Sequence, residues 1–184
     1  MTPLPDIRRL RAWLKRGGVI AYATESCFGL GCDPRNARAA RRILVLKGRP
    51  QARGLILIGS EFRQFAPFLA PVPSALASRF PTWWPGPNSL LLAAARRCPR
   101  WLTGHHDQLA VRVTAHAGTA RLCHALARAL VSTSANRAGR RALKTASACR
   151  QAFGARVWVL PGRIGRRRTP STLFDPLSGA IIRA

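Results

Sequence analysis

Residues 17–31 read GGVIAYATESCFGLG, and this stretch decides the fold. After a glycine pair, the apolar run 19–23 has the length and composition of a buried strand. The polar residues 24–26 follow it and lead into Gly29-Leu30-Gly31, which we expect to form a turn. Because α/β proteins bind ligands beside the ends of buried strands, we expect a binding site at the hydroxyls of residues 24–26.

Short apolar runs elsewhere predict further strands, and amphipathic segments between them predict helices. We expect strands at residues 55–58, 89–94, 109–113, 130–133, 157–160, 171–174 and 180–183, and helices at 6–16, 36–46, 61–68, 74–80, 119–129 and 147–153, with 101–104 in a loop. This alternation predicts an α/β fold in which a twisted, mixed parallel and antiparallel sheet is flanked by helices. No repeat or long polar linker divides the chain, so we expect a single domain over residues 1–184.

The charge is the most unusual feature of the composition. The chain has 31 Lys and Arg against 6 Asp and Glu, a net charge of +25, while a hydrophobic content of 47% excludes a disordered basic tail. A bias of the genome toward arginine codons explains such a surface without any function. A surface selected for polyanions such as RNA explains it equally well.

Cysteine usage and hydropathy indicate the compartment. The five cysteines form no CxxC pair and have no histidine at metal-ligand spacing, so we expect neither a disulfide framework nor a metal site. No apolar run reaches the roughly 18 residues of a membrane span. We therefore expect a cytoplasmic protein that does not bind a membrane.

The first motif with binding chemistry is Lys47-Gly48-Arg49-Pro50, with Arg53 close behind. It ends a predicted helix, where cations favour the negative end of the helix dipole, so a simple C-cap explains it. The alternative is an electrostatic clamp for phosphate, in which Gly48 allows backbone to approach an anion that Lys47 and Arg49 neutralise.

A second motif, residues 132–136, reads STSAN and directly follows an apolar strand. Its hydroxyls and amide are typical of a helix cap or turn, and they are equally suited to orient a polar substrate. Arg112 is a third candidate because it is a single charge within the apolar strand 109–113. Either this strand is an edge strand that exposes Arg112 to water, or the guanidinium holds an anion such as a carboxylate.

These motifs occur together in the order and spacing of a known family. Residues 23–31, 47–50, 84–87, 109–113 and 132–136 resemble the YrdC-like family, in particular its single-domain bacterial threonylcarbamoyl-AMP synthases of the TsaC type. The likeness extends from about Gly17 to Arg183. It implies an enzyme, a nucleotidyltransferase, that condenses L-threonine, bicarbonate and ATP, with Mg²⁺ accompanying the triphosphate. Partner proteins would then transfer the threonylcarbamoyl group to tRNA.

The resemblance also implies which residues contact each substrate. The family's KxR and SxN signatures fall on Lys47 and Arg49 and on Ser134 and Asn136. The ATP site is then expected at Lys47, Arg49, Arg53, Asn136 and Arg183, and the threonine site at Ser26, Arg112, Ser134 and Ser171, with Thr24 as an alternative to Ser26. No dedicated nucleophile is expected, because the carbamate of threonine attacks the α-phosphorus.

A competing hypothesis belongs to a different class of function. The charge of +25, with Trp83, Trp84 and Trp101 in predicted loops, also suits a basic protein that binds tRNA or double-stranded RNA, or acts in rRNA maturation, without turnover. The two hypotheses are compatible, since an enzyme of tRNA modification has reason to bind tRNA directly.

Overall fold

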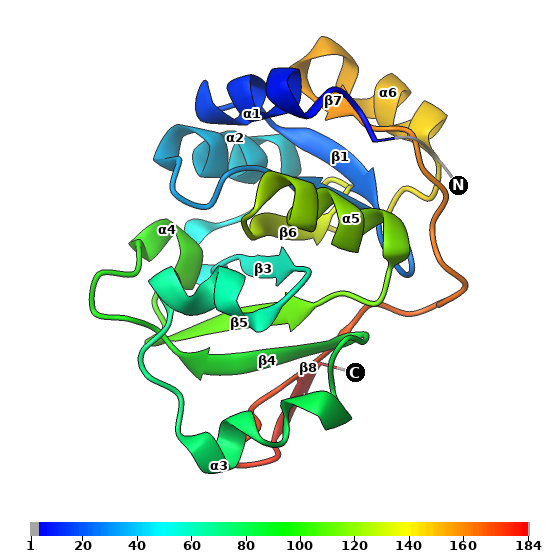
Figure 1. The fold of residues 1–184 in the computed structure, drawn as a ribbon. Coiled ribbons are helices and arrows are strands. Elements are labelled where there is room, and N and C mark those ends of the chain that lie inside the picture. Colours follow the sequence, from blue (N-terminus) through cyan, green and yellow to red (C-terminus); the bar gives the residue numbers. More distant parts are fainter. Residues whose placement is uncertain (1–3, 184) are drawn as a thin grey trace.

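The computed structural model describes residues 4–183, and within them nine strands form one sheet in the order β7-β1-β2-β6-β3-β5-β4-β8-β9 (Figure 1). The strands are β1 Ile20–Ala23, β2 Phe28–Gly31, β3 Ile56–Gly59, β4 Asn88–Ala93, β5 Gln108–Val113, β6 Leu130–Ser134, β7 Trp158–Val159, β8 Thr172–Phe174 and β9 Ile181–Arg183. The pairs β1–β7, β3–β5 and β4–β8 are parallel, and the other neighbours are antiparallel. The expectation of an α/β fold with a mixed sheet is confirmed.

Helices connect most of these strands. They are α1 Ile7–Lys15, α2 Ala37–Lys47, α3 Ser74–Ala77, α4 Arg100–Thr103, α5 Ala117–Leu126 and α6 Ala146–Phe153, with 3₁₀ turns at Gln51–Arg53, Phe62–Phe68, Phe80–Thr82 and Gly154–Arg156. The side chain of Asn36 caps the start of α2, and Gly48 ends it in the left-handed conformation at φ 60°. Lys47 is therefore the last residue of α2, and Arg49 lies in the segment that follows the helix.

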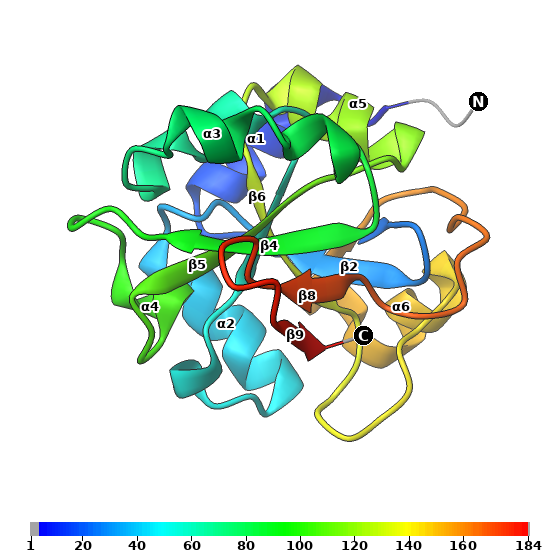
Figure 2. The same ribbon diagram turned by 90° about the horizontal axis from the view of Figure 1, so that it is seen from below.

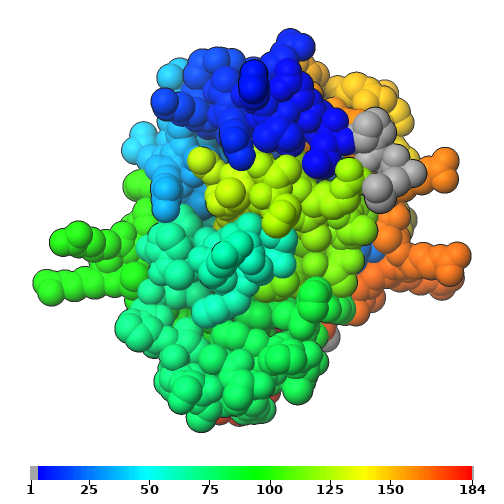
Figure 3. Space-filling view, viewed as in Figure 1, coloured from blue at the N-terminus to red at the C-terminus, as the bar shows by residue number. Residues whose placement is uncertain are grey.

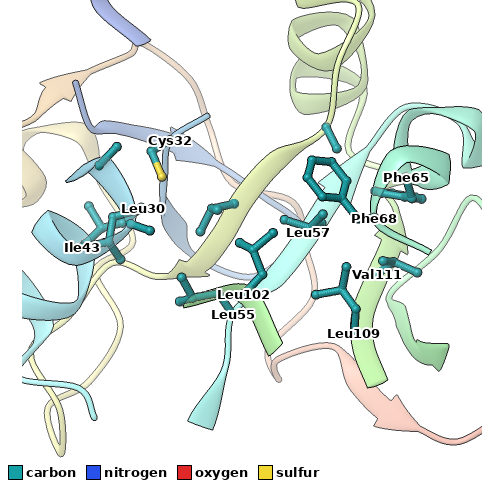
Figure 4. Packing of buried hydrophobic residues seen from close by; sticks show 14 of the residues in the cluster. Leu30, Cys32, Ile43, Leu55, Leu57, Phe65, Phe68, Leu102, Leu109 and Val111 are labelled. Carbon is teal, nitrogen blue, oxygen red and sulfur yellow. The ribbon is translucent and has the colours of Figure 1, made fainter. Parts of the chain in front are cut away.

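The sheet is covered on both faces, as the alternation of side chains along β1 shows. Ile20 and Tyr22 pack with α1 and α5 on one face, while Ala21 belongs to the larger cluster that includes residues of α2 and α6 on the other. Figure 4 shows part of this larger cluster, where Ile43 of α2 lies near Leu30 of β2. Burial on both sides explains why β1 is apolar throughout.

Two expectations about local structure were wrong. Gly29-Leu30-Gly31 is part of strand β2, antiparallel to β1, and the turn lies at residues 24–27. Glycine stands at position 31 because of packing: a Cβ there would lie 2.6 Å from both Cε1 of Tyr22 and the carbonyl oxygen of Val131. Residues 101–104, expected as a loop, lie mostly in the short helix α4.

Basic side chains are spread over the described surface. Arg8, Arg96 and Arg163 are all exposed although they come from distant parts of the chain. Figure 3 shows long side chains that project from the green and orange segments on opposite sides of the molecule. Among residues 4–183, no helix is long and apolar enough to cross a membrane.

Candidate active site

A cavity of about 610 Å³ lies where the turn after β1, the end of β6, the segment after α2 and the β8–β9 hairpin meet. Figure 2 shows the β8–β9 hairpin, the end of α2 and the loop after β6 on the same side of the molecule. Among the described residues that line it are seven cations and no carboxylate: Arg49, Arg112, Arg140, Arg141, Lys144, Arg168 and Arg183. Another cavity, of about 580 Å³, lies against α5 and is lined mainly by apolar residues, with Arg121 and Arg163 as its cations. A further cavity of about 610 Å³ beside α2 has four arginines, but the first cavity combines its seven cations with hydroxyl and amide side chains and is therefore the candidate anion-binding site.

Most of the residues expected from the sequence meet in this cavity. Its lining includes Ser26, Arg49, Arg112, Ser134, Asn136, Ser171 and Arg183. Lys47 and Arg53 are absent from the lining, for different reasons. Lys47 is buried behind it, and Arg53 is exposed in the 3₁₀ turn after α2.

The Lys47 ammonium group is held by the STSAN motif. Its Nζ donates to the carbonyl oxygen of Ser134, to the carbonyl oxygen of Asn136 at 3.0 Å and to Oδ1 of Asn136 at 2.9 Å. Burial, and then the positive charge of Arg49, lower the pKa of Lys47 to about 8. In this geometry Lys47 fixes the loop that follows β6.

The hydroxyl and amide of the STSAN motif also bind each other. Oγ of Ser134 donates to Oδ1 of Asn136 at 2.6 Å, and Nδ2 of Asn136 donates to the carbonyl oxygen of Arg140. Of the two simple interpretations of this motif, a helix cap or a turn, the helix cap is wrong because no helix of the described chain follows before α6, whereas a turn closed by the Arg140 nitrogen and the Arg137 carbonyl oxygen does follow. The loop brings Arg140 and Arg141 to the cavity wall.

Arg49 lines the same cavity and donates hydrogen bonds to backbone. Its Nη2 donates to the carbonyl oxygens of Arg53 at 3.3 Å and of Gly54 at 3.2 Å. Partial burial, followed by the charges of Arg53 and Arg183, lowers the pKa of Arg49. An anion in the cavity would relieve this repulsion between like charges.

The β8–β9 hairpin contributes Ser171 and Arg183 to the wall. Nη2 of Arg183 donates to the carbonyl oxygen of Ser171 at 2.9 Å and to its hydroxyl at 3.2 Å. The same hydroxyl lies 3.0 Å from Oγ of Ser89, a fully buried residue of β4. Ser89 thus supports Ser171 from behind, and Ser171 in turn holds Arg183.

Arg112 is on a central strand, so its interpretation as a water-facing edge residue is wrong. β5 lies between β3 and β4, and Arg112 is only 7% exposed. The expectation that its partner must come from a ligand also needs correction, because Nη1 of Arg112 lies 3.4 Å from Oε2 of Glu25. The sequence placed Glu25 beside the site but gave no sign that it reaches Arg112.

The two hydroxyls in the turn after β1 differ in availability. Oγ1 of Thr24 donates to the carbonyl oxygen of Cys27 at 2.8 Å and thereby closes the turn. The contact of the Ser26 hydroxyl is a long one, 3.9 Å to the sulfur of Cys27. Ser26 is therefore the hydroxyl better placed to bind a ligand.

Several lining residues were not expected from the sequence. Arg140, Arg141, Lys144 and Arg168 come from two basic stretches that looked like ordinary solvated surface. Only the position of Arg140 and Arg141 directly after the STSAN motif offered a signal. Ser89 offered none, since a serine within an apolar strand has no distinctive pattern.

The donor set does not suit a metal held by the protein. Mg²⁺ prefers carboxylate oxygens, and the described lining contains none. In residues 4–183 no three His, Cys, Asp or Glu side chains gather into a possible metal site.

Comparison with known proteins agrees with this geometry. The model of the Sua5/YciO/YrdC family, described as "Telomere recombination", matches residues 12–184. The threonylcarbamoyl-AMP synthase of Chromobacterium violaceum is 52% identical over 98% of this chain and 97% of its own length, and that of Thiobacillus denitrificans is 54% identical over 95% and 93%. The solved structure of P. abyssi Sua5 complexed with L-threonine superposes with a TM-score of 0.83 at 29% identity, over 92% of this chain. The match covers 50% of the length of that longer protein.

Proposed function

The chain belongs to the Sua5/YciO/YrdC family, and on that premise we propose that it is a nucleotidyltransferase that makes threonylcarbamoyl-AMP. Its substrates are L-threonine, bicarbonate and ATP, and pyrophosphate is the second product. The observation that carries the proposal is the cavity wall of seven cations without a carboxylate, which also contains the hydroxyl of Ser26, held only by its long contact with Cys27. Such a wall suits a triphosphate beside a small polar acid.

The proposed chemistry requires charge stabilisation more than a protein nucleophile. The amino nitrogen of threonine and bicarbonate first form the carbamate with loss of one water. An oxygen of this carbamate attacks the α-phosphorus of ATP, the bond from that phosphorus to the bridging oxygen breaks, and pyrophosphate leaves. Negative charge develops on the phosphate oxygens, and fixed cations and amide donors stabilise it. Mg²⁺ takes part only as an ion bound to the triphosphate.

We assign the two substrates to adjoining parts of the cavity, since residues of the two sets are hydrogen-bonded to each other, Ser134 to Asn136 and Arg183 to Ser171. ATP lies against Arg49, Asn136 and Arg183, with Lys47 holding the loop that presents Asn136. Arg53 contributes its carbonyl oxygen, which fixes Arg49. Threonine lies at Ser26, Arg112, Ser134 and Ser171, with its carboxylate on the guanidinium of Arg112. These assignments follow the family signatures, and the shared cavity supports them.

The RNA-binding hypothesis loses its aromatic support in the structure. Trp84 is buried, and Nε1 of Trp101 donates to the carbonyl oxygen of Pro34 at 3.0 Å. Trp83 packs edge-on against Phe174 with ring centroids 5.4 Å apart. Charge alone is left to attract RNA, so direct tRNA binding belongs to the proposal only as an aid to delivery of the product.

The wider setting follows from the proposed reaction. We place the enzyme in the cytoplasm, where ATP and tRNA are available, and treat residues 1–184 as a single YrdC-like domain. The adenylate is a mixed anhydride that water hydrolyses, so downstream proteins must accept it for transfer of the threonylcarbamoyl group to tRNA.

A substrate-omission assay tests the proposal. Pyrophosphate release should require L-threonine, bicarbonate and ATP together, and leaving out any one of them should reduce it to background. A folded preparation that releases no pyrophosphate with all three substrates, or that releases it without threonine, contradicts the proposed function.

A further inference from the structure

Glu25 and Arg112 form an ion pair beside the cavity. Their side chains are 12% and 9% exposed, and the closest nitrogen and oxygen atoms lie 3.4 Å apart. We propose that Glu25 is a positioning residue, which balances the charge of Arg112 while leaving the guanidinium donors free to bind the carboxylate of an amino-acid substrate. The inference rests on the proposed function for the identity of that substrate.

The two oxygens of Glu25 have different duties. Oε1 accepts hydrogen bonds from Oγ1 of Thr114 at 2.7 Å and from the backbone nitrogen of Ala115 at 3.2 Å. These donors directly follow strand β5, which also carries Arg112. The segment that carries Arg112 therefore also holds the Glu25 carboxylate in place. Oε2 is the oxygen that lies toward Arg112.

The contact supplies charge without using hydrogen-bond donors. Oε2 of Glu25 and Nε of Arg112 are both buried and have no hydrogen-bond partner among the described residues. If Glu25 made two hydrogen bonds to the guanidinium of Arg112, those two donors would be occupied and could not bind a substrate. At 3.4 Å the pair keeps its Coulomb attraction, and since Nε is buried, the terminal Nη groups of Arg112 are the donors that stay available to a second carboxylate in the cavity.

A buried guanidinium needs such a counter-charge in this cavity. Removing one partner of a buried ion pair leaves an uncompensated charge, which is costly in low-dielectric surroundings. Arg183 places a second positive charge near Arg112, and partial burial and then the charge of Arg112 lower the pKa of Arg183. This repulsion increases the need for a negative charge beside Arg112. Burial disfavours ionisation of Glu25, but Arg112 and the hydrogen bond from Thr114 outweigh it and hold the pKa of Glu25 below its ordinary value. Glu25 is therefore charged at neutral pH.

Replacement of Glu25 by glutamine tests the charge separately from the shape. The amide oxygen of Glu25→Gln can keep both bonds from Thr114 and Ala115, so its NH₂ group then faces Arg112 and places donor against donor. The guanidinium should leave its position. By titration calorimetry we expect the Kd for L-threonine to rise about tenfold. The Kd for L-threoninol, which lacks the carboxylate, should stay within about twofold of wild type.

Two further variants keep the test decisive. Glu61→Gln removes a carboxylate from an exposed pair with Arg63 and should change neither Kd. Thr114→Val removes the hydroxyl that fixes Oε1 without altering any charge, and it should weaken threonine binding in the same direction by a smaller factor. This variant serves if Glu25→Gln does not fold.

The outcomes separate the inference from the proposed function. Wild-type affinity for threonine in Glu25→Gln, or equal weakening of threonine and threoninol, overturns the positioning role and indicates a general structural one. If both affinity and selectivity change as expected but no pyrophosphate is released by wild type, the positioning role stands and the proposed reaction is wrong.

Discussion

Lys47 offers the sharpest test of how the cavity is built, because its ammonium group holds the end of the STSAN motif and the loop that follows β6. The substitution Lys47→Met keeps the length and the apolar stem of the side chain and removes every donor. Oδ1 of Asn136 keeps the hydrogen bond from Ser134, and the carbonyl oxygen of Ser134 keeps one from the Asn136 nitrogen. The carbonyl oxygen of Asn136 loses its contact with Nζ, which is its hydrogen bond in this loop.

The size of the effect follows from this accounting. An orphaned buried acceptor costs about 1–3 kcal/mol, and because Asn136 is only half-buried we expect the free energy of unfolding to fall by about 1 kcal/mol. In a chain of this length that corresponds to a decrease of about 2–4 °C in Tm. Because the loop that presents Asn136 loosens, the KM for ATP should also rise, by about tenfold.

Thermal unfolding followed by circular dichroism, together with steady-state kinetics, measures both effects. Lys144→Met is the matched control, since Lys144 lines the same cavity but is exposed, and its Tm should match wild type. If Lys47→Met raises the KM for ATP without lowering Tm, Lys47 contacts the nucleotide directly and its role as a support for the loop is refuted.

Four further predictions test other parts of the account. With its pKa at about 8, Lys47 loses its proton as pH rises through that value, so kcat/KM for ATP should fall above pH 8 in a pH–rate profile; a flat profile to pH 10 contradicts this. Arg112→Ala should raise the KM for threonine at least tenfold and that for ATP little, whereas Arg49→Ala should do the reverse, and equal effects on both substrates in both variants would show that this division of the cavity between them is wrong. Ser89→Ala removes the hydroxyl behind Ser171 and should cost about 1 kcal/mol in urea unfolding while raising the KM for threonine; unchanged kinetics would limit Ser89 to packing. Gly31→Ala places a Cβ 2.6 Å from a backbone oxygen and should lower stability by at least about 2 kcal/mol in the same assay, and wild-type stability would mean that β2 shifts freely.

Local patterns predicted the elements of the fold because each depends on nearby residues. The apolar run before Thr24 forms β1, and the segment from Ala37 to Lys47 forms a helix that Gly48 ends. Glycines were the exception. Gly31 looks like a turn residue in the sequence, but it stands where two other strands leave no room for a side chain. Only the three-dimensional sheet contains that information.

In the candidate site, too, local motifs identified individual residues, whereas contacts between residues distant in the sequence could not be predicted. The family signatures pointed to Arg49 and Asn136, a single charge within an apolar strand pointed to Arg112, and the structure brings all three to one cavity. The contact between Glu25 and Arg112 joins residues 87 positions apart, and that of Ser89 with Ser171 joins residues 82 apart. Neither pair has a local pattern, so no reading of the chain could find them.

The charge of +25 now has a partial explanation. Seven of the 31 cations line the cavity, and Lys47 supports it from behind. The remaining ones are spread over the surface, where they produce a general attraction for polyanions that should weaken steeply with added salt.

Direct detection of the product tests the central claim most closely. The protein is incubated with ATP, L-threonine and ¹³C-bicarbonate, and the mixture is examined by mass spectrometry. The account predicts threonylcarbamoyl-AMP that carries one ¹³C atom and disappears when threonine or bicarbonate is omitted. Hydrolysis of ATP without this labelled adenylate would contradict the account.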